Sequence, residues 1–209
     1  ASAGLASLRE VAAALREFRA SGKQVVAYAH GMDQRGYLLA AAADEVYLHP
    51  SGAVLLEGFA AYRPYYREGL QDKLGVDVHL FRVGEYKSAA EPFIRDSASE
   101  EDREANLFWM QDLWDRHLAE IATARGLDAA ELQAGIDALP ERVRAVGGDL
   151  GRLAVEQGLV DALKTAEEVD TLMAERGHPG DDGQGFRQVS MDDYLGFVGR
   201  ERRMALRAR

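Results

Sequence analysis

The sequence predicts an α/β fold with one main domain. Segments with helical periodicity alternate with short apolar runs of strand length, which is the order typical of layered α/β proteins. The chain has 209 residues, 47% of them hydrophobic, and this is enough for one sizeable core. No apolar run approaches the length of a membrane span, and the opening "ASAGLASLRE" lacks the pattern of a signal peptide.

The first four predicted elements alternate between helix and strand. "LASLREVAAALREFRA" places its apolar residues on one helical face, and Gly22 supplies the stop. "QVVAYAH" has the length and composition of a strand. An alanine-rich buried helix follows the turn at "GMDQRG", and a second strand is predicted over residues 46–48, closed by Pro50.

The next segment leads to a lysine motif. "AYRPYYREGLQDKLG" is predicted to form an amphipathic helix that ends at Gly75, and "VDVHLFRVG" alternates apolar and polar residues like a strand. It runs into "FRVGEYKSAAEPFIRD", so Lys87 is expected on a loop at a strand exit. Such loops are where α/β folds commonly mount their chemistry.

The clearest helix signal lies in "SASEEDREANLFWMQDLWDRHLAEIATARG". Ser99 and Asp102 form a variant of the capping box, and Trp109, Trp114 and Leu118 are predicted to pack inward. "GGDLGRLAVEQGLVDAL" predicts a glycine turn, a short helix and a strand end near Leu159. After residue 176 we expect a loop, followed by a terminal helix or connector.

Composition excludes several classes of function. With 35 acidic and 25 basic residues the net charge is −10, which disfavours a nucleic-acid partner. The absence of cysteine removes thiolate nucleophiles and cysteine metal sites. None of the five histidines has the spacing of a helical metal pair, and the sequence contains neither a P-loop nor a Gly-x-Ser-x-Gly elbow. No metal or cofactor is therefore expected.

Lys87 is the candidate catalytic residue, as a general base. A neutral lysine can take a proton from a serine hydroxyl without a histidine or an aspartate. This role requires a lowered pKa, and burial can lower the ordinary value of about 10.4 by several units. Tyr86 and Phe93 offer apolar surroundings, whereas Glu85 and Glu91 would act against the shift unless both point elsewhere.

The sequence offers no convincing serine to pair with this lysine. Ser88 is adjacent, but neighbouring side chains on an extended segment point to opposite faces. The other serines lie in predicted helix caps, in turns or near the termini. On the residues alone, Lys87 is a base without a nucleophile.

The motif "FRVGEYKSAAEPFIRD", followed by "EEDREAN", resembles the amino-terminal half of the long, two-half form of signal peptide peptidase A, in the ClpP/crotonase-like serine protease family. The resemblance extends through "SGKQVVAYAHGMDQRGYLLAAAADEVYLHP", "EGFA" and "GGDLGRLAVEQGLVDAL". It implies the amino-terminal half of a spiral of repeated ββα units. Residues 1–165 would form the lysine-bearing half domain, and residues 166–209 a terminal helix and connector toward an absent second half.

The resemblance also implies a division of the catalytic residues. The family lysine falls on Lys87, and the serine nucleophile belongs to the second half. In this chain the equivalent window is "HGMDQRGY", where Gln34 stands about where that serine would be. The chain alone is therefore expected to be inactive.

The implied whole protein is a Ser/Lys serine endopeptidase that degrades cleaved signal peptides and other apolar peptides. Its implied partners are these peptides, the serine-bearing second half and further copies in a homo-oligomer. The implied location is the periplasmic face of the bacterial inner membrane, with membrane association through a segment absent here.

Two other functions stay open. The chain could be a catalytically silent scaffold half that builds an oligomer and a substrate groove, in which case loss of Lys87 would leave activity intact. It could also be a crotonase-like acyl-CoA enzyme, in which Asp33 would be the candidate acid or base, although fold analogy alone does not carry function.

Overall fold

The computed structural model describes residues 4–81, 83–84, 86–178, 180 and 185–207, the last seven by their backbone alone. It shows a mixed α/β architecture with small parallel sheets. In chain order the elements are α1 (Leu5–Ala20), β1 (Val26–Ala29), β2 (Met32–Asp33), α2 (Gln34–Ala40), β3 (Glu45–Leu48), β4 (Val54–Leu55), the π-helical η1 (Glu68–Lys73), α3 (Glu91–Ile94), α4 (Glu100–Arg125), α5 (Ala129–Asp137), α6 (Leu139–Ala145), α7 (Leu150–Glu156), β5 (Ala162–Leu163), α8 (Ala166–Arg176) and α9 (Met191–Arg207).

Two parallel sheets lie at the centre of the body. β1, β3 and β5 pair in that spatial order, and β2 pairs with β4. Because β2 follows β1 and β4 follows β3, successive stretches of chain add one strand to each sheet. Gly52 lies where the strand ends crowd together, since a Cβ there would stand 2.4 Å from the carbonyl oxygen of His30. Only glycine permits this close approach.

Helices cover the sheets and complete the core. α1 packs on α2, α2 contacts α4, and α7 lies against β4 and β5. Tyr37 in α2 is fully buried, and its hydroxyl donates a hydrogen bond to the carbonyl oxygen of Leu159 at 2.5 Å. Burial raises the pKa of this phenol, so the group stays a protonated donor. Other fully buried side chains are Val46, Leu48, Ile121 and His117.

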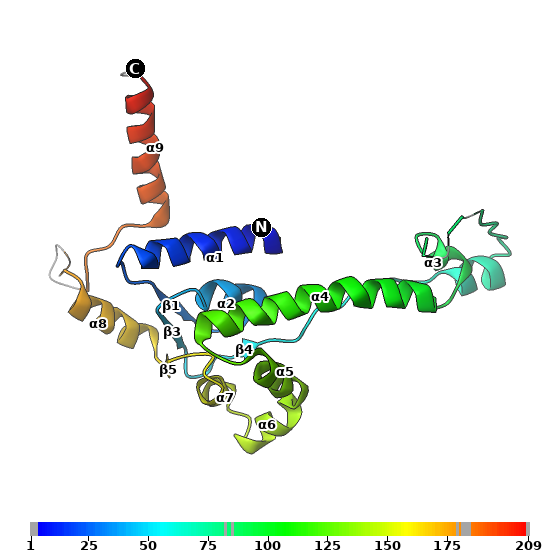
Figure 1. Ribbon diagram of the computed structural model, residues 1–209, viewed down its shortest axis with the longest axis horizontal. Helices are drawn as coiled ribbons and strands as arrows, with labels where there is room; N and C mark the ends of the chain where they lie inside the picture. The colour runs from blue at the N-terminus through cyan, green and yellow to red at the C-terminus, as the bar shows by residue number, and fades with distance from the viewer. Residues whose placement is uncertain (1–3, 82, 85, 179, 181–184, 208–209) are drawn as a thin grey trace.

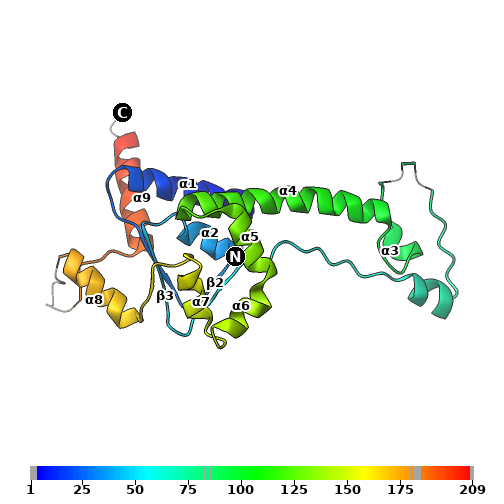
Figure 2. The ribbon, with the colours of Figure 1, turned by 60° about the horizontal axis from the view of Figure 1, so that its bottom comes forward.

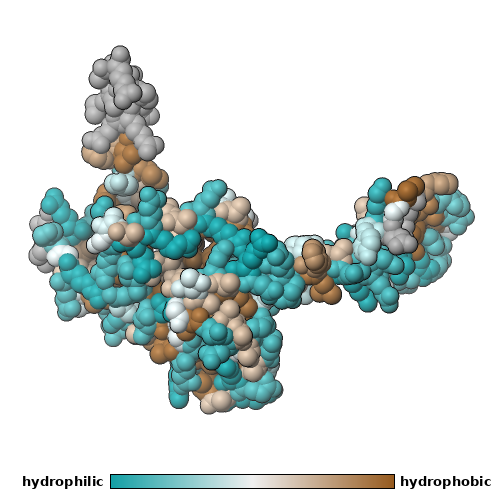
Figure 3. Space-filling view, in the orientation of Figure 1, coloured by the Kyte–Doolittle hydropathy of each residue, from teal (hydrophilic) through white to brown (hydrophobic). Residues whose placement is uncertain are grey.

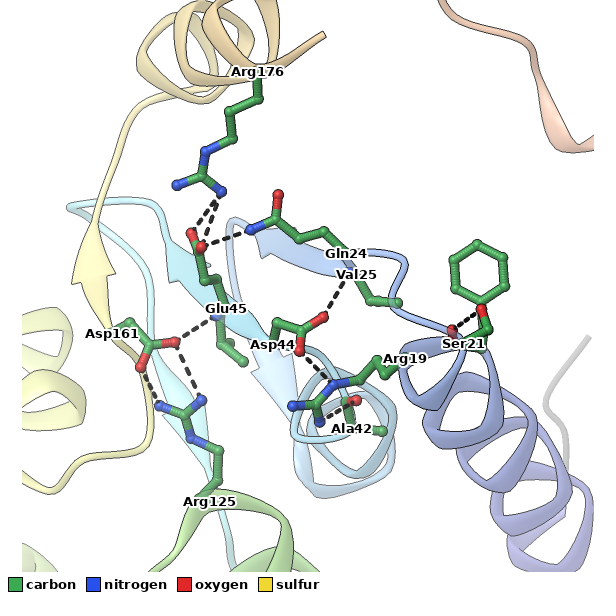
Figure 4. A network of polar contacts seen from close by, with 12 residues as sticks. Arg19, Ser21, Gln24, Val25, Ala42, Asp44, Glu45, Arg125, Asp161 and Arg176 are labelled. Atoms are coloured by element: carbon green, nitrogen blue, oxygen red, sulfur yellow. Dashed lines mark hydrogen bonds and ion pairs between the residues drawn. The ribbon is translucent and has the colours of Figure 1, made fainter.

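Charged side chains fasten the elements around the start of β3 (Figure 4). The Asp44 carboxylate accepts hydrogen bonds from the Val25 N–H at 2.8 Å and from Arg19 Nε at 2.7 Å, and these two bonds lower its pKa. Burial alone would raise the pKa of Asp161, but hydrogen bonds from Arg125 and a backbone N–H outweigh it and lower the value. These contacts tie α1 and α4 to the sheet.

An arm projects from this body, and we define it as residues 60–110 (Figures 1 and 2). The chain leaves after β4, runs through residues 60–66 without regular secondary structure, forms η1 and reaches α3 at the far end. α4 then leads back to the body. Its second half is buried at Leu118 and Ile121, whereas Phe108 in its first half is 80% exposed.

The structure corrects two elements predicted within the arm. Residues 61–66 are not helical, and η1 is all that forms of the predicted helix. Pro64 accounts for the absence of helix before it, because proline disfavours helical geometry in the preceding residue. The strand predicted over residues 76–84 is also wrong, since its described residues pair with no strand. Alternating residues favour a strand only where a neighbour completes its hydrogen bonds, and Phe81 here is 96% exposed.

The inward face predicted for the long helix is confirmed at Trp114 and Leu118, which are 6% and 3% exposed. It is wrong for Trp109, which is 49% exposed and donates its indole N–H to Asn106 at 3.1 Å. Trp109 lies in the first half of α4, which belongs to the arm. The Ser99 cap is confirmed, since its hydroxyl accepts a hydrogen bond from the Asp102 N–H. The helices α5 and α6 are not among the elements predicted from the sequence.

Candidate functional site

Lys87 lies in the loop before α3, and α3 lies at the far end of the arm (Figure 2). The lysine follows an extended segment, not the strand that the sequence predicts. Its side chain is exposed, and its aliphatic stem lies over Gly84, where a Cβ would be 3.8 Å from Cγ and Cε of Lys87. Gly84 has a φ of 102°, a backbone conformation that glycine adopts without strain.

Hydrogen bonds from three parts of the arm hold the main chain around Lys87. The Ser88 carbonyl oxygen accepts from the Glu91 N–H at 3.0 Å and from Arg63 Nη1 at 3.1 Å. On the near side, the Tyr86 hydroxyl donates to Glu104 on α4 at 3.1 Å. Residues 88–91 therefore form a hydrogen-bonded turn directly after the lysine, and the turn is braced from outside.

Glu91 anchors this turn to α4. Its side chain is buried, with 1% exposure, and its carboxylate accepts hydrogen bonds from the Ser99 N–H at 3.0 Å and the Ser99 hydroxyl at 2.6 Å. Ser99 is in turn the N-cap of α4. From the sequence, Glu91 is only a charge near Lys87, and its anchoring role is not predicted. The cap at Ser99 is the sequence signal for such a role. The backbone N–H of a capping residue needs an acceptor, and a nearby carboxylate can supply it.

The other acidic neighbour, Glu85, lies outside the described residues. The general-base role of Lys87 requires a lowered pKa and therefore at least partial burial in the assembled protein. In the chain by itself Lys87 is exposed, so burial on assembly stays a prediction.

Gln34, expected near the position of a nucleophile, is the first residue of α2, and Lys87 precedes α3. α2 belongs to the body, whereas α3 lies at the end of the arm (Figure 1). The Gln34 amide oxygen accepts hydrogen bonds from the Glu57 N–H at 3.0 Å and the Gly58 N–H at 3.1 Å, and its amide nitrogen donates to the Gly58 carbonyl at 2.8 Å. The preceding Asp33 caps α2 through the Gly36 N–H. The Gln34 side chain therefore holds residues 57 and 58 at the base of the arm.

Apolar side chains are exposed along the arm (Figure 3). Phe81 and Val83 precede Lys87 and are 96% and 84% exposed, and Tyr62 is 95% exposed. A hollow of about 640 Å³ lies between residues 61–65 and the first half of α4. Large exposed apolar surfaces mark sites that another molecule covers. Among the described helices, none is long and apolar enough to cross a membrane.

Comparisons with known proteins agree with the motif around Lys87. The family model described as "Peptidase family S49" matches residues 17–178. "Protease 4" of Salmonella typhi is 40% identical over 188 residues, which are 90% of this chain and 30% of that protein. "Protease 4" of Haemophilus influenzae is 33% identical over 193 residues, or 92% and 31% of the two chains.

A plant protein, "Serine protease SPPA, chloroplastic" of Arabidopsis thaliana, is 25% identical over 175 residues, which are 84% of this chain and 24% of that protein. The chain thus spans about 30% of the length of the two bacterial relatives, in their N-terminal part. The resemblance to the amino-terminal half of signal peptide peptidase A is confirmed.

Proposed function

Because the chain belongs to peptidase family S49, we propose that it supplies the lysine general base of a Ser/Lys serine endopeptidase. The observation that carries the proposal is the position of Lys87, exposed on a braced turn at the end of the arm. A residue there can meet a hydroxyl brought by another segment. The described part of the body holds an amide, Gln34, where the family resemblance would place that hydroxyl.

The proposed reaction uses Lys87 twice. The neutral amine takes the proton of the serine hydroxyl as the oxygen attacks the peptide carbonyl, and the resulting ammonium returns a proton to the leaving amine. In the second step the neutral amine takes a proton from water as the water oxygen attacks the acyl-enzyme carbonyl. The ammonium then returns a proton to the serine oxygen as the acyl group leaves. The serine belongs to a second half of the same protein, so the chain alone is inactive.

The proposed whole-protein fold is a spiral of repeated ββα units. The parallel pairs β1–β3 and β2–β4 support it, because each ββ unit then stacks on the preceding one. Residues 1–165 are proposed as the lysine-bearing half domain and residues 166–209, which contain α8 and α9, as the connector to the second half.

The proposed substrates are cleaved signal peptides and other apolar peptides. The exposed apolar side chains of the arm support this choice, since such surface is suited to an apolar chain or to a neighbouring subunit. A homo-oligomer at the periplasmic face of the bacterial inner membrane, attached through a segment outside this chain, completes the proposal.

The same exposed surface favours a second candidate, a scaffold half that builds an oligomer and a groove without chemistry of its own. The two candidates differ in what they require of Lys87. The general-base role needs the amine, whereas the scaffold role needs only the apolar side chains around it.

Substitution of Lys87 in the assembled two-half protein tests the proposal. Lys87→Ala should reduce kcat for an apolar peptide by about 10²- to 10⁴-fold, the range for loss of a general base. Lys73→Ala is the matched control, because Lys73 is a lysine of the same arm that pairs with Glu68 at 2.9 Å. Full activity of the Lys87→Ala protein would refute the general base and leave the scaffold role.

A further inference from the structure

We propose that Glu91 is a positioning residue that sets the place of Lys87 through the turn between them, an inference that rests on the proposed general-base role. Glu91 is nearly fully buried although it belongs to the projecting arm. A buried carboxylate is costly unless hydrogen bonds compensate it. Here its oxygens accept from the N–H and the hydroxyl of Ser99, which points to an anchoring role.

The path from Glu91 to Lys87 along the chain is short, so a shift of Glu91 reaches Lys87. Only three residues separate Lys87 from Glu91, and the Glu91 N–H closes the intervening turn on the Ser88 carbonyl at 3.0 Å. Any shift of Glu91 therefore moves the backbone of Ser88, which is bonded directly to Lys87. Because residues 88–91 form one hydrogen-bonded turn, the loop has little freedom to absorb that shift.

Ser99, the partner of Glu91, belongs to a long helix that reaches the core. Ser99 caps α4, a helix of 26 residues whose second half lies in the core. Its hydroxyl also accepts the Asp102 N–H at 3.1 Å, so Glu91, Ser99 and the first turn of α4 form a continuous chain of hydrogen bonds. A carboxylate at this end of a helix is further favoured by the helix dipole.

Arg63 supports the same turn from the other side. Its Nη1 donates to the Ser88 carbonyl at 3.1 Å and lies 4.0 Å from Oδ1 of the buried Asp102. The Arg63 side chain is 42% exposed, so solvent competes for this contact. Glu91, which is buried and accepts two hydrogen bonds from Ser99, is therefore the main anchor and the residue to test.

The test compares three variants of the assembled two-half protein with the wild type. Glu91→Ala removes the anchor, and the displaced base should lower kcat by about 100-fold, as for a misplacement on the order of 1 Å, with little change in KM. Glu91→Gln should restore most of the loss, because its amide oxygen accepts the Ser99 N–H and its amide nitrogen donates to the Ser99 hydroxyl. Glu100→Ala is the control, since Glu100 is an exposed acid in the first turn of α4, next to Ser99, and should behave as wild type.

A second readout does not depend on peptidase activity. The rate at which Lys87 Nζ is acylated by an amine-selective reagent, followed by peptide mass spectrometry across pH, should change in Glu91→Ala and return in Glu91→Gln. This separates the two hypotheses: a fully active Lys87→Ala protein refutes the base, whereas an unaltered labelling profile in Glu91→Ala refutes the positioning.

Wild-type kcat and pH–rate profile in Glu91→Ala would overturn the proposal, as would equal losses in Glu91→Ala and Glu91→Gln. If Glu91→Ala does not fold, Ser99→Ala takes its place. It removes the hydroxyl contact and leaves the N–H contact, so it should show a smaller loss of kcat in the same direction. No change of kcat or labelling in a folded Ser99→Ala protein would then be the contradicting result.

Discussion

His117 is a buried histidine at the junction of arm and body. Its ring is fully buried, stacks on Trp114 and meets Phe59 edge-on. Neither ring nitrogen has a partner of hydrogen-bond geometry in the described part of the chain, although the Gln34 backbone lies near. The pKa of His117 is lowered, chiefly because burial disfavours the charged form. Nearby Glu120 opposes the shift and Arg9 reinforces it.

This lowering predicts a loss of stability in mild acid. The unfolded histidine takes up a proton as pH falls below about 6.5, whereas the folded one resists protonation, so its contribution is complete above that pH and lost below it. A His117→Phe protein keeps an aromatic ring and cannot titrate. Its free energy of unfolding, measured by denaturant titration, should fall less than that of wild type between about pH 7.5 and 5.

The carboxylates of the body affect stability in a lower range of pH than His117 does. The lowered pKa values of Asp44 and Asp161 mean that their contribution is present above about pH 4 and lost only in stronger acid. The His117 effect can therefore be measured separately. Parallel pH profiles for wild type and His117→Phe between about pH 7.5 and 5 would contradict a neutral buried histidine.

At the scale of the element, α4 provides a matched pair of tryptophans. Trp114 is 6% exposed and donates its indole N–H to Gln133 at 2.7 Å, whereas Trp109 is 49% exposed. Trp114→Ala should lower the free energy of unfolding by about 3–5 kcal/mol, the cost of removing a buried aromatic ring. Trp109→Ala should cost within about 0.5 kcal/mol, as for a surface position. Similar values for the two variants in denaturant titrations would show that the exposed half of α4 is also packed.

The tryptophans also show what the sequence can predict about this helix. Periodicity predicts α4, its cap at Ser99 and the inward direction of Trp114, because these depend on residues within the helix itself. It cannot predict that the helix enters the body only after Trp109, because that depends on where other elements end. The unpaired segment 76–81 fails for the same reason, since a strand is defined by its neighbour.

The candidate site was predictable to a similar degree. The motif around Lys87 identified the family and the candidate base, but the anchor at Glu91 and the brace at Arg63 required the structure. Arg63 and Ser88 are 25 residues apart in sequence, and no local pattern announces such a contact. The role of Gln34 in holding residues 57 and 58 is long-range in the same way.

At the scale of the molecule, the chain alone should have no peptidase activity. Removing the nucleophile from a group of residues that act together costs nearly the whole rate enhancement. Activity should appear on addition of a serine-bearing second half, and it should vanish again with Lys87→Ala. Cleavage of an apolar peptide by the purified chain, abolished by Ser88→Ala, would contradict the two-half mechanism.

α4 joins the body to the end of the arm that carries Lys87. The direction in which this end faces therefore depends on the number of residues in the helix. A helix rotates by about 100° and advances about 1.5 Å for each residue. One residue inserted at the exposed Gln111 would therefore swing the whole end of the arm about a quarter of a turn around the helix axis, with every contact at that end intact. Peptidase activity of the assembled protein should survive Gln111→Ala and be lost on that single insertion. The length of α4 therefore sets the direction in which the end of the arm faces.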